Sequence, residues 1–191
     1  MRIDMQEIGG STSLAGAPRG QAALTKLIAA IGPDAPQPQL VFFDFANIEV
    51  ATASYLRESV LACRDFVRSQ RPSYYPVIAN ANDDVKDELL VLMKARREVV
   101  MTCALDENDN VSDVALVGEL EPAQKTTYEL VNEHGETDAG ALMEQYGERE
   151  KTTRATAWNN RLSALAALGL VVEESRGRAK RYRPLFEPQG A

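Results

Sequence analysis

The chain has 191 residues, 45% hydrophobic residues and a formal net charge of −7 at pH 7, an ordinary composition for one large or two small globular domains. No run approaches the roughly twenty apolar residues that cross a bilayer, and the first ten residues lack the regions of a signal peptide, so we expect a cytoplasmic protein. Two cysteines and one histidine are too few for a histidine-based metal site or a Ser-His-Asp triad, and we expect no metal, no cofactor and no catalytic residue.

The first forty-five residues are expected to contain a strand, a helix and a second strand. The strand covers residues 2–8, and the helix covers residues 20–31, where leucines and isoleucines recur on one side. The proline-rich connection that follows cannot continue a helix. The run LVFFDF at residues 40–45 is apolar apart from Asp44, as is typical of a strand covered on both faces. We predict that it is the central strand.

The alternation of helices and strands continues to residue 120. Cys63 and Cys103 lie in apolar runs without a partner at metal-ligand spacing, so both are expected to be reduced and buried. The acidic turn at 106–110 lacks the glycine and terminal glutamate of an EF-hand loop, which favours a polar hairpin turn. The expected elements are a helix over 53–68, a strand over 74–79, a helix over 83–96 begun by acidic capping residues, and strands over 99–105 and 111–120.

One stretch of this region resembles a known signature. The run VFFDFANIEVATASYLRESVLACRDFV, residues 41–67, is similar to STAS-like domains, relatives of the sulfate-transporter and anti-sigma-factor-antagonist fold. In that family a strand ending in an aspartate, here Asp44, leads to a serine at the start of a helix, here Ser54. The resemblance implies a mixed sheet with helices, a role in dimerisation, partner binding or signal sensing, and phosphorylation of Ser54. The sequence departs from the family pattern at Thr52 and Tyr55, and the plain interpretation of Ser54 is a helix N-cap.

From residue 121 the pattern becomes helical, and we place the domain boundary there, which gives domains over 1–120 and 121–191. Pro122 suits the first turn of a helix. Gly135 ends that helix, and a short second helix follows around Leu142.

A longer helix and a hairpin complete the second domain. The helix is expected from Thr153 onward, with Trp158 and Leu162 on its packing face. Gly169 ends this helix, and a two-stranded hairpin with its turn at Gly177 follows.

This order of elements resembles the winged-helix domains of bacterial transcription regulators, through the LxxLxxLGLV run at 162–171 and an arginine-rich strand closing on Tyr182. The implied fold class is α/β: a STAS-like mixed sheet with helices, joined to a C-terminal winged helix-turn-helix (α+β) domain. The charges agree, because residues 149–183 hold nine basic and three acidic residues, whereas residues 1–120 hold eleven and seventeen. A basic surface on an acidic body favours binding to double-stranded DNA.

The predicted DNA contacts fall into two sets, base-reading side chains and phosphate-binding cations. The base-reading set on the helix is Thr153, Arg154, Thr156, Asn159 and Asn160, and for each of them a solvated surface position is the plain alternative. The cations are Lys151 and Arg161 near the helix, and Arg176, Arg178, Lys180, Arg181 and Arg183 on the hairpin.

We therefore expect a sequence-specific DNA-binding transcriptional regulator. It should act as a homodimer, because one reading helix covers only a few base pairs. The STAS-like domain could also bind a regulatory protein partner. The alternative is a protein–protein interaction module, similar to an anti-sigma-antagonist adaptor, whose cations meet an acidic partner without DNA. Asp44 with Glu49 imitates an acid/base pair, but no phosphate-cradling loop accompanies them, so an enzyme is not expected.

Overall fold

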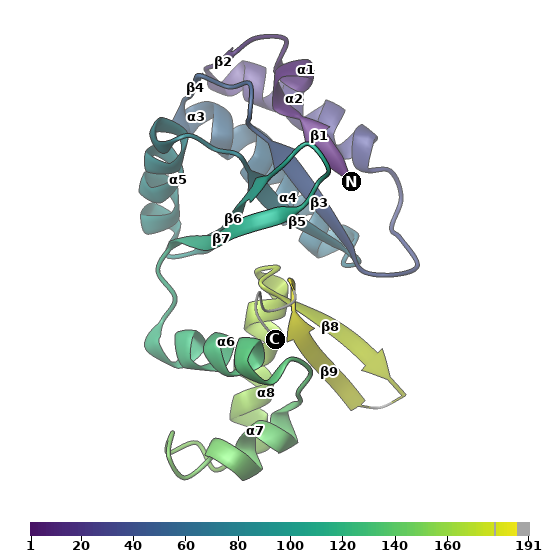
Figure 1. The fold of residues 1–191 in the computed structure, drawn as a ribbon, viewed down its shortest axis with the longest axis vertical. Helices are drawn as coiled ribbons and strands as arrows, with labels where there is room; N and C mark the ends of the chain where they lie inside the picture. The colour runs from purple at the N-terminus through teal and green to yellow at the C-terminus, as the bar shows by residue number, and fades with distance from the viewer. Residues whose placement is uncertain (178, 187–191) are drawn as a thin grey trace. The chain divides into compact units, whose positions relative to one another are not determined.

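A computed structural model describes residues 1–177 and 179–186, and for Arg176 only the backbone (Figure 1). The chain divides into two compact units, Met1–Glu119 and Leu120–Ala191, and this division lies one residue before the boundary placed from the sequence. The fold is mixed α/β, as the alternation of segments predicts.

The first unit is built on a five-stranded mixed sheet in which the strands follow their order along the chain. The first four strands are parallel, and the last is antiparallel to its neighbour. The run predicted as the central strand is β3, which lies between β1 and β5 and is therefore second in the sheet; β5 is the middle strand. The sheet order is β1 (Arg2–Asp4), β3 (Gln39–Asp44), β5 (Tyr74–Ala79), β6 (Val99–Leu105) and β7 (Val111–Gly118).

A second, very small parallel pair was not expected from the sequence. It joins β2, Ser13–Leu14, to β4, Val50–Ala51. Leu14 and Ala51 are buried in this pair, whereas Val50 is 45% exposed. Val50 thus lies at the surface, whereas Ala51 enters the core two residues before a helix that begins at Ala53.

The helices that connect the parallel strands form the main core with the sheet. Val41 and Phe43 of β3 belong to one buried cluster with Leu27, Leu56 and Leu89 from three helices. Connections between parallel neighbours are right-handed almost without exception, so consecutive strands place their helices on one face. The helices are α1 (Met5–Gly9), α2 (Ala17–Ile31), α3 (Ala53–Leu56), a π-helical turn (Arg57–Leu61), α4 (Ala62–Gln70) and α5 (Asp83–Arg96).

The starts of α1 and α5 differ from the prediction. The strand predicted over 2–8 ends at Asp4, whose side chain accepts the backbone N–H groups of Gln6 and Glu7 at 2.6 and 3.4 Å and starts α1. Helix α5 is capped by Asn82, which accepts the backbone N–H of Val85 at 2.9 Å. The acidic residues predicted as its caps lie in the first turn instead, where carboxylates favour the positive end of the helix dipole.

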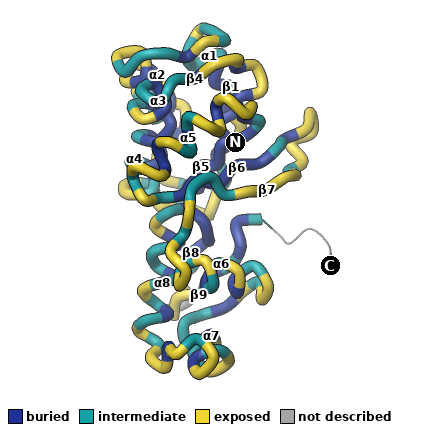
Figure 2. Tube along the Cα trace, turned by 90° about the vertical axis from the view of Figure 1, so that its left-hand side faces the viewer, coloured by how far each residue is buried: buried dark blue, intermediate teal, exposed yellow. Residues whose placement is uncertain are grey.

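Both cysteines are free and buried, as predicted. Burial raises the pKa of the Cys63 thiol to about 12 and that of the Cys103 thiol to about 11. Buried positions run through the interior strands and the inner sides of the helices, whereas the turns are exposed (Figure 2). The two thiols therefore behave as small apolar side chains.

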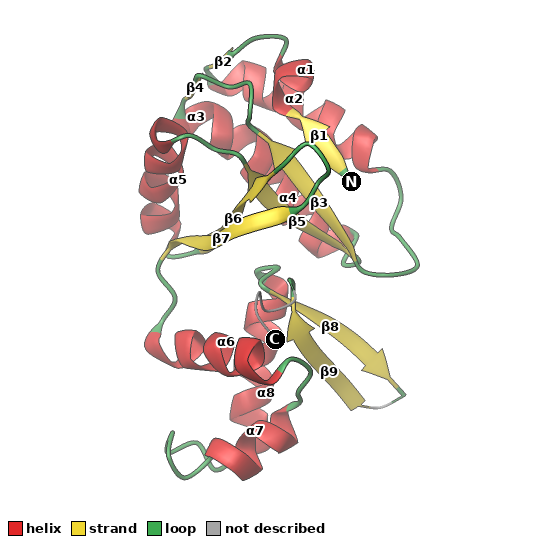
Figure 3. Ribbon diagram, viewed as in Figure 1, coloured by secondary structure: helices red, strands yellow, loops and turns green. Residues whose placement is uncertain are grey.

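The second unit is a group of three helices followed by a hairpin (Figure 3). Helices α6 and α7 both pack against α8, and the buried Leu130, Leu142 and Trp158 bring one apolar side chain from each helix to the core. The elements are α6 (Pro122–His134), α7 (Ala139–Tyr146), α8 (Ala155–Ala167), β8 (Val171–Arg176) and β9 (Ala179–Pro184).

The connection between α6 and α7 pairs with the hairpin. Thr137 and Tyr182 form an isolated antiparallel bridge, in which each backbone N–H donates to the other residue's carbonyl oxygen at 2.9 Å. Tyr182 is also buried, and its hydroxyl lies 3.1 Å from that of Ser163 on α8. Strand β9 is thus held on one side by β8, on the other by Thr137, and from beneath by α8.

Candidate nucleic-acid interface

The start of α8 is fixed by Trp158. This side chain is fully buried, and its indole N–H donates to the carbonyl oxygen of Thr152 at 2.8 Å. The helix begins at Ala155 with Arg154 as N-cap, two residues later than predicted, so Thr153 precedes it. A buried tryptophan bonded to its own entering loop holds the first turns of α8 in a defined position.

The polar side of α8 is exposed at its amino-terminal half. Thr156 and Asn160 are exposed and lie one helical turn apart. Thr153 and Arg154 are exposed just ahead of the helix, and Asn159 is half-buried on its flank. Four of the five predicted base-reading residues therefore share an accessible region at the start of α8.

The same polar row does not continue along the helix. Ser163, which the helical spacing places on the outward face, lies beside Tyr182, with the two hydroxyl oxygens 3.1 Å apart. The hairpin thus covers this position. The exposed polar stretch of α8 therefore ends at Asn160, so contacts through this face are limited to the amino-terminal half of the helix.

Arg161 has partners inside the unit. Its Nη2 donates to Oγ1 of Thr152 at 2.9 Å, and its guanidinium carbon lies 5.0 Å from the ring centre of Trp158. The side chain is half-buried. Arg161, predicted as a phosphate contact, therefore braces the loop before α8, whereas Lys151 in the same loop is exposed.

The described cations of the hairpin are all ion-paired. Lys180 Nζ lies 2.8 Å from Glu173 Oε1, and Arg183 Nε donates to Glu174 Oε1 at 3.1 Å. Both pairs run diagonally across the hairpin, because the register sets Glu173 opposite Tyr182 and Glu174 opposite Arg181. The hydrogen bond to Glu173 raises the pKa of Lys180.

Arg181 points to a different element. Its Nη1 lies 2.8 Å from Oδ2 of Asp138, the N-cap of α7. Arg178 lies outside the described residues, and so does the side chain of Arg176. The side chains of Lys180, Arg181 and Arg183 are 46%, 39% and 42% exposed, so all three remain accessible while paired.

The acidic partners were missed because the sequence gives their charge but not their position. A surface ion pair contributes about 0–1 kcal/mol, so a DNA phosphate has little to overcome in replacing a carboxylate. The carboxylates nevertheless cancel part of the positive field that nine basic residues in 149–183 suggest. The hairpin is a mixed-charge surface rather than a purely cationic one.

A further aromatic pair of this unit was also missed. His134 Nε2 and the hydroxyl of Tyr146 lie 2.5 Å apart, and the guanidinium carbon of Arg149 is 4.5 Å from the Tyr146 ring centre. These residues join the ends of α6 and α7. Their spacing along the chain carries no pattern that indicates the contact.

In the first unit, Ser54 does not cap its helix. The N-cap of α3 is Thr52, which has extended backbone angles and accepts the N–H of Tyr55 at 3.4 Å. Ser54 is half-buried as the second helical residue, with its hydroxyl 3.2 Å from that of Thr52. The backbone N–H of Ala53 donates to Oε2 of Glu88 at 2.9 Å. The first turn of α3 is therefore satisfied by Thr52 and Glu88.

Asp44 holds the ends of three strands together. Its Oδ1 accepts the backbone N–H of Ala46 at 3.0 Å and the side-chain amide of Asn80 at 2.8 Å, and its Oδ2 accepts Arg2 Nε at 2.8 Å. Hydrogen bonds to Asp109 and then Asp44 raise the pKa of Arg2. These contacts fit loop capping, which the sequence favours over an acid/base pair with Glu49.

No known protein family, curated protein or solved structure matches this chain. Among the residues that the structure describes, no group of three or more His, Cys, Asp or Glu side chains is arranged to hold a metal ion. Within the same residues, no helix has both the length and the apolar character to cross a membrane.

Proposed function

We propose that this protein is a sequence-specific DNA-binding transcriptional regulator, with a winged-helix second unit and a STAS-like first unit. The observation that carries the proposal is the exposed start of α8, with Thr156 and Asn160 one turn apart. Beside α8 lies a hairpin with three accessible cations, Lys180, Arg181 and Arg183.

The residue types on α8 suit the major groove. Asparagine pairs with adenine edges, and the threonine methyl group contacts the thymine methyl group. Thr156 and Asn160 are separated by about 6 Å along the helix, which is close to two base-pair steps of about 3.4 Å each. Arg154 and Lys151 flank this pair on the entering loop, where cations meet the phosphates beside the groove.

Binding through the hairpin exchanges carboxylates for phosphates. Lys180 and Arg183 leave Glu173 and Glu174, whose remaining negative charge repels the DNA backbone. This cost acts on every sequence equally, so it weakens non-specific binding and increases the share of affinity that comes from base contacts. About five phosphate contacts lower the affinity about 500-fold between roughly 50 and 200 mM salt.

The test is selection of bound DNA from a random library, followed by titration of the selected duplex at several salt concentrations. The double variant Arg181→Glu, Arg183→Glu is expected to lose binding. Arg19→Glu with Arg57→Glu is the matched control, because both are exposed arginines of the first unit and the change in net charge is the same. Absence of binding to any duplex at low salt rejects the proposal.

One observation favours the second candidate, a protein-interaction module without DNA binding. Each described hairpin cation already has a carboxylate partner in its own unit, so the surface is electrostatically satisfied without nucleic acid. Co-purification of a stoichiometric protein partner, together with no measurable affinity for the selected DNA, supports this candidate instead.

The STAS-like resemblance adds a proposed input at Ser54. A phosphate there joins the first turn of α3, where the helix dipole favours negative charge. It also lies next to Ala53, whose N–H is bonded to Glu88, so we expect phosphorylation to displace that carboxylate. Intact mass spectrometry of protein from its native cells checks this; no phosphorylated fraction under any growth condition removes it.

A further inference from the structure

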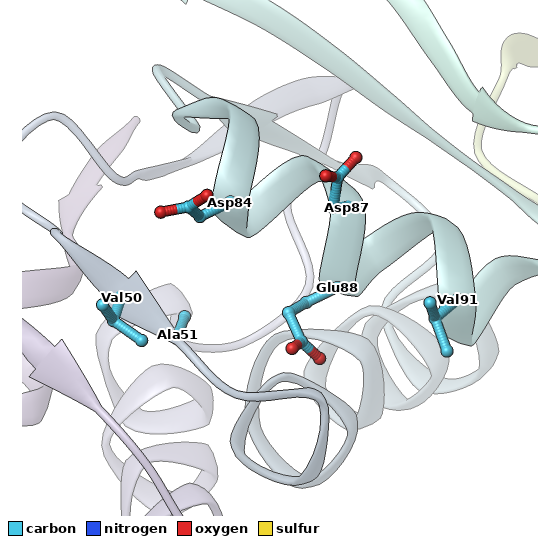
Figure 4. A pocket seen from close by; sticks show the side chains of 6 residues that line it. All are labelled: Val50, Ala51, Asp84, Asp87, Glu88 and Val91. Atoms are coloured by element: carbon cyan, nitrogen blue, oxygen red, sulfur yellow. The ribbon is translucent and has the colours of Figure 1, made fainter.

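One hollow on the first unit combines exposed valines with acidic side chains (Figure 4). It has a volume of about 360 Å³ and lies between α5 and β4. Val91 is 63% exposed and Val50 is 45% exposed, and they are two of the four large hydrophobic side chains exposed in the described chain. The hollow is lined by Val50, Ala51, Asp84, Asp87, Glu88 and Val91.

The charges of α5 are separated along its length. Acidic residues dominate the first turns, through Asp84 and Asp87, and basic residues such as Lys94 and Arg97 dominate the end. This arrangement complements the helix dipole. It also makes the exposed face complementary to a reversed copy of itself, because a copy running in the opposite direction brings its basic end to the acidic end of the first.

Asp87 and Lys94 are the two charged residues near the centre of this face. Arg96 is bonded to Asp65 and Glu98, but within the described residues no ion pair holds Asp87 or Lys94. Both side chains are exposed, as is Val91 between them. The face therefore offers one apolar side chain with an unpaired acid on one side along the helix and an unpaired base on the other.

We infer that a second copy of this chain docks on α5, with the two α5 helices antiparallel and related by a twofold axis at Val91. Asp87 precedes Val91 by four residues, about 6 Å along the helix, and Lys94 follows it by three, about 4.5 Å. Both lie on the same side of Val91 around the helix, at about 40° and 60° for 100° per residue. Antiparallel packing thus sets Asp87 against the partner's Lys94, twice by symmetry.

The hollow accommodates the apolar part of this contact. The partner's Val91 and Ala95 face the region between Asp87 and Val50, where the surface is hollowed. Glu88 is kept out of the contact, because its carboxylate is bonded to the backbone N–H of Ala53. Such an interface uses the same patch on both copies, so it closes as a dimer.

The inference deepens the proposed function, in which the first unit mediates dimerisation, but it does not require DNA binding. Sedimentation velocity of the full chain without DNA tests it. Asp87→Lys and Lys94→Asp each replace two attractions by two repulsions, and each is expected to weaken the dimer about thirtyfold. The double variant restores the pairing with the charges exchanged and should dimerise like the original protein.

A mixture of the two single variants gives the sharpest result. Asp87→Lys carries two lysines on this face and Lys94→Asp two carboxylates, so equal amounts should form a heterodimer although neither forms a stable homodimer. Val91→Lys should also give a monomer, whereas Val114→Lys, at a 39% exposed valine of β7, should not. Thermal melting of each variant checks that the fold is retained.

Three outcomes overturn the inference: the original protein is a monomer at every concentration, the single variants dimerise unchanged, or the mixture stays monomeric. Failure of the proposed function looks different, because a dimer that passes these tests and binds no DNA rejects DNA binding and leaves the α5 interface standing.

Discussion

Removing the carboxylates of the hairpin should strengthen DNA binding. The perturbation is the double substitution Glu173→Gln, Glu174→Gln, which frees Lys180 and Arg183 from their partners. Each carboxylate about 7 Å from a phosphate costs about 0.6 kcal/mol of repulsion in water. Two of them cost about 1.2 kcal/mol, which corresponds to a roughly eightfold tighter complex at low salt.

The assay is fluorescence anisotropy with the selected duplex at low and high salt. The advantage of the double variant should shrink as salt rises, because exposed charges are screened over about 8–10 Å. A control that changes the net charge equally, Glu7→Gln with Glu107→Gln on the first unit, should leave the affinity unchanged. If the hairpin variant binds DNA no better than the original protein, the hairpin does not approach phosphates and the reasoning fails.

Three further predictions concern the fold. Leu162→Ala removes a fully buried side chain of α8, one helical turn after Trp158, and should cost about 2–5 kcal/mol. The fluorescence of the single tryptophan measures the unfolding of this unit, and an unchanged midpoint contradicts the packing. Gly118→Ala should destabilise the first unit by about 1–3 kcal/mol, because φ at Gly118 is +108° and the new Cβ would lie 2.3 Å from the carbonyl oxygen of Glu98. Chemical denaturation followed by circular dichroism measures this loss of stability. Gly140→Ala on α7 is the control that should be tolerated. Cys63 and Cys103 should resist alkylation at pH 8 until the protein unfolds, since their pKa values are raised to about 12 and about 11. The contribution of these thiols to the free energy of unfolding is complete below the ordinary thiol pKa of 9.0 and is lost as the pH rises toward the raised pKa values. Rapid labelling of the native protein would refute the assigned burial.

The sequence predicts elements well where a local signal marks both ends. The bounds of β5, α5 and β6 match the prediction, because apolar runs and acidic first-turn residues mark them. The strand predicted over 2–8 was correct for Arg2–Asp4 and wrong beyond it, because the apolar residues that follow suit a strand or a helix equally. The side chain of Asp4 favours the helix, because it accepts hydrogen bonds from the backbone N–H groups of Gln6 and Glu7.

The proposed DNA surface was predictable as a set of residues but not as an electrostatic surface. Whether Lys180 is paired depends on the hairpin register, which brings Glu173 within reach on the adjacent strand. The pair of Arg181 with Asp138 depends on the bridge between Thr137 and Tyr182, forty-five residues apart. Neither contact has a local sequence signal, so a count of charges overstates the free positive charge.

The bridge between Thr137 and Tyr182 also has a mechanical consequence. A hairpin that contacts its domain only at its base samples many orientations, and a binding partner loses affinity because it must restrict these orientations. Here Tyr182 of strand β9 is hydrogen-bonded to the α6–α7 connection and to the hydroxyl of Ser163. The orientation of the hairpin is thus already set in the free protein, and its Arg181 is also tied to Asp138, the N-cap of α7.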